Sequence, residues 1–326
     1  MTAEKVFLAH GRVRAVWRFF LSVPLVFFAM YLANATASFI ARPEDMARWG
    51  RVVWSTLLLL PALLAAFKLL TAACDRKPLG SVGLAFCGRW RMEFGLGLGV
   101  GALMILSVAA TETVLGAAQF SWSPVSPGRF LSWGGATLVL LLVAATNEEL
   151  IFRGYPFQRL AESLGGPGAV ALSSVLFGLM HLGNPSHSWI STLNTVLVGV
   201  PLAVSYLRTR ALWMPVGIHF AWNFLQGFGL GLPISGFSVP LSALKAEVSG
   251  APLLTGGSYG PEASILTTIV IVAATGYLWR TKSIYLSEEM HALVFGPVRA
   301  EVSAPETVVQ LNISPEPEMT DRPKPT

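Results

Sequence analysis

Residues 131–153 have the sequence LSWGGATLVLLLVAATNEELIFR, and this stretch decides the fold of the chain. Its first part, up to Asn147, contains no charged residue, whereas Glu148, Glu149 and Arg153 follow directly. A helix needs roughly 20 mostly apolar residues to cross about 30 Å of hydrocarbon. The stretch therefore predicts a membrane-spanning helix that ends in ionisable side chains.

The composition of the whole chain agrees with a membrane protein. Of the 326 residues, 53% are hydrophobic and only 13% are Asp, Glu, Lys or Arg, about half the charged share of a soluble protein. The mean hydropathy is +0.59. The net charge of +5 comes from basic residues that lie between apolar runs rather than in one patch, which argues against nucleic-acid binding. Two cysteines, Cys74 and Cys87, are too few for a disulfide framework.

Charge-poor runs on both sides of residues 131–153 predict further spans. Together they indicate an all-α, polytopic transmembrane helical bundle of about eight spans. The turn signals of residues 182–186 divide one long uncharged stretch into two spans. The predicted spans are residues 19–41, 52–73, 94–119, the helix that begins at 131, two spans within 163–207, then 211–232 and 263–279.

The distribution of Lys and Arg in the short flanks predicts that both termini are cytoplasmic. The loop after the first span contradicts this pattern, because it carries Arg42, Arg48 and Arg51. The first run exceeds the usual apolar region of a signal peptide, so a retained helix is favoured over a cleaved one. The predicted organisation is a cytoplasmic flank (1–18), N-terminal transmembrane helices (19–130), core helices (131–232), an extracytoplasmic loop (233–262), a last helix (263–280) and a cytoplasmic, largely disordered tail (281–326).

The acidic pair in the core separates into two roles by helix geometry. Glu149 and Arg153 are four residues apart, in the order that favours an ion pair within a helix. Glu148 is rotated by about 100° from that pair and presents an unpaired carboxylate. An unpaired carboxylate of this kind can take and return a proton, as a general base must. The alternative is a solvated cluster at the cytoplasmic end of a span.

Two histidines follow on later predicted spans. They occur as Phe177-x-x-x-His181 and His219-x-x-x-Asn223, so each pair lies on one helix face. Counting along the helices at about 1.5 Å per residue places both histidines and Glu148 in the inner half of one bundle. A histidine in a span is alternatively a helix–helix hydrogen-bonding residue, but three converging groups favour a reactive site.

A carboxylate, two imidazoles and an amide fit the hydrolysis of an acyl bond. The Glu can deprotonate water, one His can hold that water or a metal, and the other His with the Asn can stabilise an oxyanion. The chain has no suitable Cys nucleophile and no His-Glu-x-x-His motif. Its Gly-x-Ser-x-Gly sequence, residues 256–260, lies in the predicted extracytoplasmic loop and not at the strand-to-helix turn of a nucleophile elbow. Cysteine and thermolysin-type zinc mechanisms therefore lack their motifs, and a serine mechanism lacks its structural setting.

These three motifs, in this order on successive helices, resemble the CPBP family of intramembrane endopeptidases. That family includes type II CAAX prenyl endopeptidases and bacteriocin-processing or self-immunity proteins, and the resemblance covers roughly residues 131–229. It implies that Glu148 is the general base, that Glu149 with Arg153 forms a supporting ion pair, and that His181 positions the water. The roles it implies for the remaining site residues are oxyanion stabilisation by His219 and Asn223, with Phe177 in support.

The resemblance leaves the cofactor open between none and zinc. A metal would be held by Glu148, His181 and His219, but Asn223 would then have no role. A metal-independent glutamic peptidase is therefore the favoured interpretation.

The expected partners are membrane lipid and a peptide or protein substrate at the membrane, with no nucleic acid. The sequence fixes no oligomeric state and does not show whether the substrate is prenylated. Short loops and cationic flanks favour a bacterial cytoplasmic membrane. Two other functions compete: a non-catalytic scaffold or bacteriocin-immunity factor, and a proton-coupled transporter in which Glu112, Glu148 and the histidines form a relay. The transporter interpretation lacks the expected internal repeat.

Overall fold

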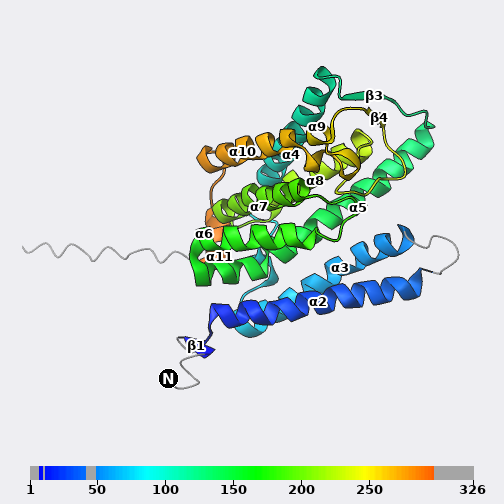
Figure 1. Ribbon diagram of the computed structural model, residues 1–326. Coiled ribbons are helices and arrows are strands. Elements are labelled where there is room, and N and C mark those ends of the chain that lie inside the picture. The colour runs from blue at the N-terminus through cyan, green and yellow to red at the C-terminus, as the bar shows by residue number, and fades with distance from the viewer. Residues whose placement is uncertain (1–6, 10–11, 42–48, 297–326) are drawn as a thin grey trace, which may run out of the picture.

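The computed structural model describes residues 7–9, 12–41 and 49–296. Its main elements form a bundle of helices (Figure 1), as predicted from the charge-poor runs. The long helices are α2 (Ala15–Ile40), α3 (Trp49–Leu70), α4 (Trp90–Val114), α5 (Pro127–Arg153), α6 (Tyr155–Met180), α7 (Trp189–Thr209), α8 (Trp213–Phe224) and α10 (Ile265–Arg280). Smaller elements are α9 (Pro252–Thr255), α11 (Glu288–Phe295), and the strands β1 (Leu8–Ala9), β2 (Arg12–Val13), β3 (Ala118–Trp122) and β4 (Leu244–Val248).

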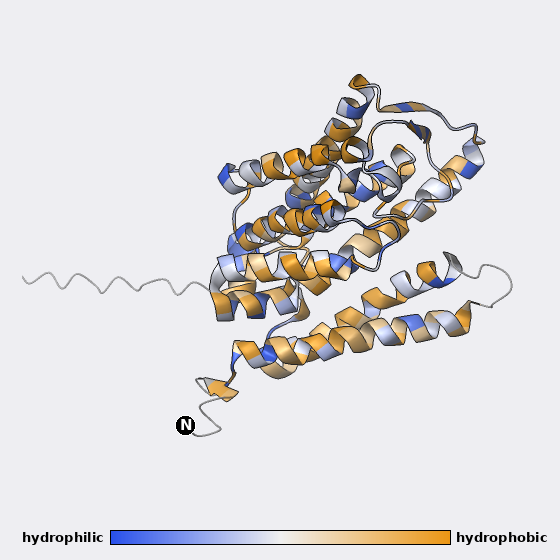
Figure 2. Ribbon diagram, viewed as in Figure 1, coloured by the Kyte–Doolittle hydropathy of each residue, from blue (hydrophilic) through white to orange (hydrophobic). Residues whose placement is uncertain are grey.

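The chain is an integral membrane protein. Within the described residues, five helical segments are long and apolar enough to cross a membrane, and one of them, Pro127–Met180, contains both α5 and α6. Hydrophobic residues make up much of each long helix (Figure 2). Phe28, Leu103 and Ile269 expose 60%, 69% and 60% of their surface, an exposure that is costly in water and favourable in lipid.

The structure differs from the predicted spans in three places. The third helix ends at Val114, and the chain then forms β3, which pairs antiparallel with β4 from the later loop. Residues 155–164 are helical, and the kink between them and the rest of α6 lies at Gly165, whose φ of 74° favours glycine. The last predicted core span is shorter as an α-helix, because α8 continues as the π-helical turn Leu225–Gly229.

Part of the tail that was predicted to be largely disordered forms a helix. Residues 288–295 form α11, while residues 297–326 lie outside the described residues. The N-terminal strands and α11 lie at the same end of the bundle (Figure 1). We call this end, predicted to be cytoplasmic, the inner end.

Helix α8 lies in the centre of the bundle and contacts α4, α5 and α7. It packs closely against α4 at Gly217. A Cβ atom there would lie 2.6 Å from the carbonyl oxygen of Phe94, so only glycine permits this packing. The packing fixes the position of His219, half a turn farther along α8.

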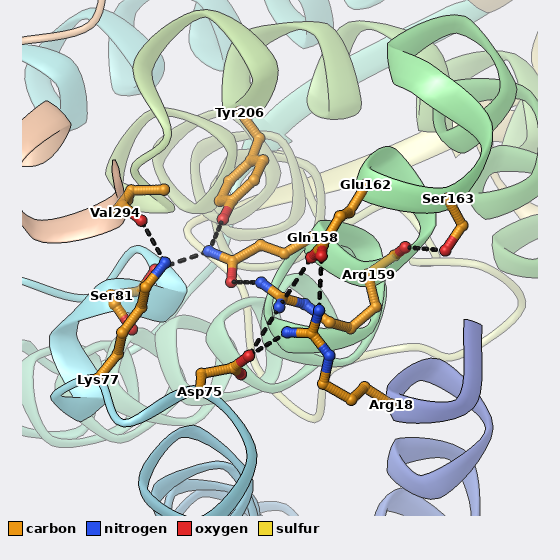
Figure 3. A network of polar contacts seen from close by, with 10 residues as sticks. All are labelled: Arg18, Asp75, Lys77, Ser81, Gln158, Arg159, Glu162, Ser163, Tyr206 and Val294. Carbon is orange, nitrogen blue, oxygen red and sulfur yellow. Dashed lines mark hydrogen bonds and ion pairs between the residues drawn. The ribbon is translucent and has the colours of Figure 1, made fainter. Parts of the chain in front are cut away.

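Helices α2 and α3 form a hairpin along one side of the bundle (Figure 1). Their contacts with the other helices are chiefly those of α2 with α6 and of α3 with α5. Four side chains pin the hairpin at the inner end (Figure 3). Arg18 from α2 pairs with Asp75, which follows α3, and with Glu162 of α6, while Arg159 of α6 lies 2.9 Å from Asp75 and 3.0 Å from Glu162. We call Arg18, Asp75, Arg159 and Glu162 the inner-end ion network.

Candidate active site

The last turn of α5 contains the predicted ion pair. Arg153 Nη1 lies 3.2 Å from Glu149 Oε1, and neither side chain is exposed. Arg153 Nη2 also donates to the carbonyl oxygen of Gly199 on α7, at 3.2 Å. The guanidinium lies 4.5 Å from the centre of the Phe177 ring, a cation–π contact. The pair that the i, i+4 spacing predicts is confirmed, and it joins three helices.

Glu149 has a second partner that the sequence did not reveal. His219 Nδ1 on α8 lies 2.9 Å from Glu149 Oε1. An ionised carboxylate only accepts hydrogen bonds, so the proton of this bond belongs to Nδ1. The contact therefore fixes the tautomer and orientation of the imidazole and directs Nε2 toward Glu148.

His181 is oriented in the same way by its own backbone. It lies at the C-terminal cap of α6, and its Nδ1 donates to the carbonyl oxygen of Phe177, at 2.8 Å. The imidazole packs edge-on against the Phe177 ring, with 4.8 Å between ring centres. Because a carbonyl oxygen only accepts, Nδ1 carries the proton and Nε2 of neutral His181 is an acceptor. Phe177 and His181 lie on one helix face, as their spacing predicts.

The three predicted groups converge on one point. Glu148 Oε2 lies 3.8 Å from His181 Nε2 and 3.7 Å from His219 Nε2. This oxygen is buried and has no hydrogen-bond partner in the protein. We call Glu148, Glu149, His181 and His219 the carboxylate–histidine cluster. With both imidazoles neutral, three acceptors face one another, an arrangement that is stable only when they share a proton donor.

The cluster opens into a cavity of 2170 Å³. Most of the wall is apolar, and it is formed by α2, α3, α5, α6, α7, α8 and the loop of residues 234–240. Asn223 lines the cavity one helical turn beyond His219, as the spacing predicts. Polar groups of the wall include Asn147, Glu148, His181, His219, Asn223 and Glu262.

Bound zinc would require shorter distances between the same side-chain atoms. Tetrahedral zinc with bonds of about 2.0–2.1 Å separates its ligand atoms by roughly 3.3 Å, less than the distances from Glu148 to the two histidines. Within the described residues, no group of three or more His, Cys, Asp and Glu side chains is arranged to hold a metal ion. The cluster thus has the donor types of a catalytic zinc site, two imidazoles and a carboxylate, at wider separations than bound zinc would set.

Two polar residues of the cavity were missed by the sequence analysis. Asn147 of α5 donates to the carbonyl oxygen of Thr56 on α3, at 2.8 Å. Glu262 accepts hydrogen bonds from the side chain of Gln226 and from Ser235. No sequence signal marked either residue. Asn147 is uncharged and precedes the acidic pair, and Glu262 lies in a predicted loop, where charged residues are common.

The same region of the chain matches known proteins. Residues 131–225 match the family model described as type II CAAX prenyl endopeptidase Rce1-like. A Bacillus subtilis protein named "Putative membrane peptidase YdiL" is 33% identical over 86 residues. That alignment covers 26% of this chain and 33% of the relative, so the match spans about a third of the relative's length.

No solved structure matches the chain. The family match nevertheless begins in α5 and ends just after α8, so it contains each of the three motifs and the convergence point described above. The resemblance inferred from those motifs is confirmed: residues 131–225 are similar to the Rce1-like family of type II CAAX prenyl endopeptidases.

Proposed function

We propose that the protein is an intramembrane endopeptidase that hydrolyses peptide bonds with a water molecule activated by Glu148. The observation that carries this proposal is the convergence of His181 Nε2 and His219 Nε2 on Glu148 Oε2, at 3.8 and 3.7 Å. Water fits this point because it can donate to one carboxylate oxygen and one imidazole nitrogen at once. The family match and the membrane-peptidase name of the relative support the same reaction class.

The chemistry follows from the orientation of each group. Glu148 removes a proton from water while His181 Nε2 accepts the other hydrogen, and the water oxygen attacks the carbonyl carbon of the scissile bond. The developing oxyanion accepts hydrogen bonds from Asn223 and from His219 in its doubly protonated form, which the carboxylate of Glu149 stabilises. Glu148 then transfers its proton to the leaving nitrogen, so the products are a carboxylic acid and an amine.

The shape of the cavity supports a lipid-associated substrate. Its wall extends from the carboxylate–histidine cluster to the hairpin of α2 and α3, with Phe27, Met30 and Leu59 among its apolar residues. An apolar wall of this extent favours an isoprenoid or acyl chain attached to the peptide. We therefore propose a prenylated CAAX-type peptide as the first substrate class to test, in a bacterial cytoplasmic membrane.

The test is cleavage of a quenched fluorescent farnesylated CAAX peptide by the purified full chain in detergent. An unprenylated peptide of the same sequence is the control for the lipid, and Glu148→Gln is the control for the base. Cleavage that is lost in Glu148→Gln and survives a strong chelator supports the metal-independent mechanism. Chelator-sensitive cleavage would restore zinc, and failure of folded wild-type protein to cleave either peptide would contradict this substrate class.

A further inference from the structure

Asn147 is a polar residue of the cavity to which the proposed reaction gives no role. It precedes Glu148 on α5, and only 3% of its surface is exposed. Its Nδ2 donates to the carbonyl oxygen of Thr56 on α3, at 2.8 Å. Its Oδ1 is buried and has no hydrogen-bond partner in the protein.

The orientation of this amide is fixed by chemistry. The oxygen of Thr56 can only accept, so the NH₂ group of Asn147 faces α3 and Oδ1 is the atom left free. A buried acceptor without a partner in the protein is destabilising unless a water molecule or a ligand supplies a donor. The neighbouring cavity-lining residues of α5, Leu140, Leu141 and Ala144, are apolar. Asn147 Oδ1 is therefore an acceptor without a partner in a mostly apolar wall, and a ligand that matches it offers an N–H or O–H donor.

The position of this acceptor relative to Glu148 indicates which donor it meets. Adjacent residues of a helix differ by about 1.5 Å in height and 100° in direction, so Asn147 and Glu148 line neighbouring parts of one cavity. An extended peptide advances about 3.3 Å per residue and leaves its N–H groups unpaired. In an apolar cavity each of these groups needs an acceptor.

We infer that Asn147 Oδ1 accepts a hydrogen bond from a main-chain N–H of the substrate, within about two residues of the scissile bond. Asn147 is thus a substrate-positioning residue, and its bond to Thr56 holds the acceptor rigidly against α3. The inference rests on the proposed peptidase function, because it supplies the peptide that the site binds. It assigns Asn147 to the binding of the peptide backbone, while Glu148 acts on the water.

The experiment combines a protein variant with a substrate variant. Asn147→Ala and wild type are assayed with the farnesylated CAAX peptide and with a series of the same peptide in which one amide nitrogen at a time is methylated. Loss of one buried hydrogen bond lowers kcat/KM about tenfold. We expect this loss in Asn147→Ala and, in wild type, for one methylated position near the scissile bond. Methylation at that position should cause no further loss in Asn147→Ala.

Ser107→Ala is the control for a polar side chain outside the cavity. The hydroxyl of Ser107 donates to Leu103 O within its own helix, so its removal should leave kcat/KM unchanged. If Asn147→Ala lowers kcat/KM equally for every peptide, and the methylation effect persists, Asn147 is structural and the inference is wrong. Unchanged kcat/KM in Asn147→Ala would also overturn it.

A binding measurement separates this inference from the proposed function. The fluorescent farnesylated peptide is titrated by anisotropy into Glu148→Gln and into the Glu148→Gln, Asn147→Ala double variant, with thermal unfolding to verify both folds. A Kd about tenfold weaker in the double variant supports the acceptor role even if wild type cleaves no peptide. Normal cleavage with equal Kd values contradicts the acceptor role alone, and absence of both binding and cleavage contradicts both proposals.

Discussion

The inner-end ion network and the carboxylate–histidine cluster are both groups of ionisable side chains that join several helices, yet they differ in charge balance. In the network, Arg18 and Arg159 face Asp75 and Glu162, so two cations meet two anions. In the cluster, Glu148 and Glu149 have a single guanidinium between them, that of Arg153. The cluster therefore carries one negative charge that only an added proton or a proton donor can compensate.

The two groups also differ in what they face. The four residues of the network are absent from the wall of the cavity, whereas Glu148, His181 and His219 line it. The network ties α2, the end of α3 and α6 to one another (Figure 3). A balanced group that faces other helices stabilises the fold, and an unbalanced group that faces a cavity is available for chemistry. The following changes test this difference, in order of decreasing effect.

Glu148→Gln should have the largest effect, and it should be confined to activity. The substitution keeps the shape and removes the base, so we expect kcat to fall by about 10³-fold or more, which corresponds to roughly 4 kcal/mol. The thermal unfolding midpoint should stay within a few degrees of wild type, because this carboxylate has no hydrogen-bond partner at Oε2. Peptide cleavage and unfolding are measured on the same detergent sample, and retained cleavage would remove Glu148 from the mechanism.

Asp75→Ala should act on stability. It leaves Arg18 and Arg159, whose side chains are 7% and 9% exposed, without their shared carboxylate. Breaking a buried pair in this way costs about 3–5 kcal/mol of the free energy of unfolding, which unfolding by SDS in mixed micelles can measure. Glu247→Ala, which breaks the exposed pair with Lys245, is the control and should leave stability unchanged. An equal effect of both substitutions would show that the network is not a structural anchor.

Glu149→Gln should lower both activity and stability. The lost carboxylate charge weakens the bond that orients His219 Nδ1 and leaves the guanidinium of Arg153 without its ion-pair partner. We expect kcat to fall about 10²-fold for the folded fraction, with KM little changed, because the imidazole is misdirected while the cavity remains. Glu149→Asp should recover part of the loss. A change in KM alone would instead place Glu149 in substrate binding.

The sequence predicted those parts of the molecule that depend on neighbours within one helix. Charge-poor runs located the helices, and the i, i+4 spacing located the pair of Glu149 with Arg153. The bond between Glu149 and His219 joins residues 70 positions apart, and Arg159 is 84 positions from Asp75. Contacts of this kind depend on how helices pack, so single-sequence periodicity does not contain them. The pairing of β3 with β4 was missed for the same reason.

The convergence of Glu148, His181 and His219 was predicted only in part. Counting along the predicted helices placed Glu148, His181 and His219 at similar depth, because depth in a membrane is set by helix length. Counting did not give the rotation of each helix, which decides whether side chains meet. For α8, that rotation is set by the close packing at Gly217 and by the hydrogen bond that His219 donates to Glu149. The roles of these residues, and that of Asn223, stay predictions until the variants are assayed.

The smallest expected effect concerns Glu262, an acid outside both groups. It lies in the short helix Pro261–Ala263, and burial raises its pKa to about 7 even though Gln226 and Ser235 donate hydrogen bonds to it. An unfolded Glu titrates near 4.3, so the folded protein binds this proton more tightly. The stability that results is complete below about pH 4 and is lost as pH rises through about 7.

The effect of Glu262 is isolated by the difference in free energy of unfolding between wild type and Glu262→Gln, measured from pH 5 to pH 8. Gln behaves as a permanently protonated side chain, so wild type should lose about 1–3 kcal/mol relative to the variant over that interval. Glu247→Gln is the control, because its hydrogen bond to Lys245 lowers the pKa of Glu247 and its titration is complete below pH 5. A difference that stays constant across the interval would show that Glu262 is ionised throughout. Its hydrogen bonds from Gln226 and Ser235 would then compensate for its burial, and Glu262 would be a third pattern of buried charge beside the network and the cluster.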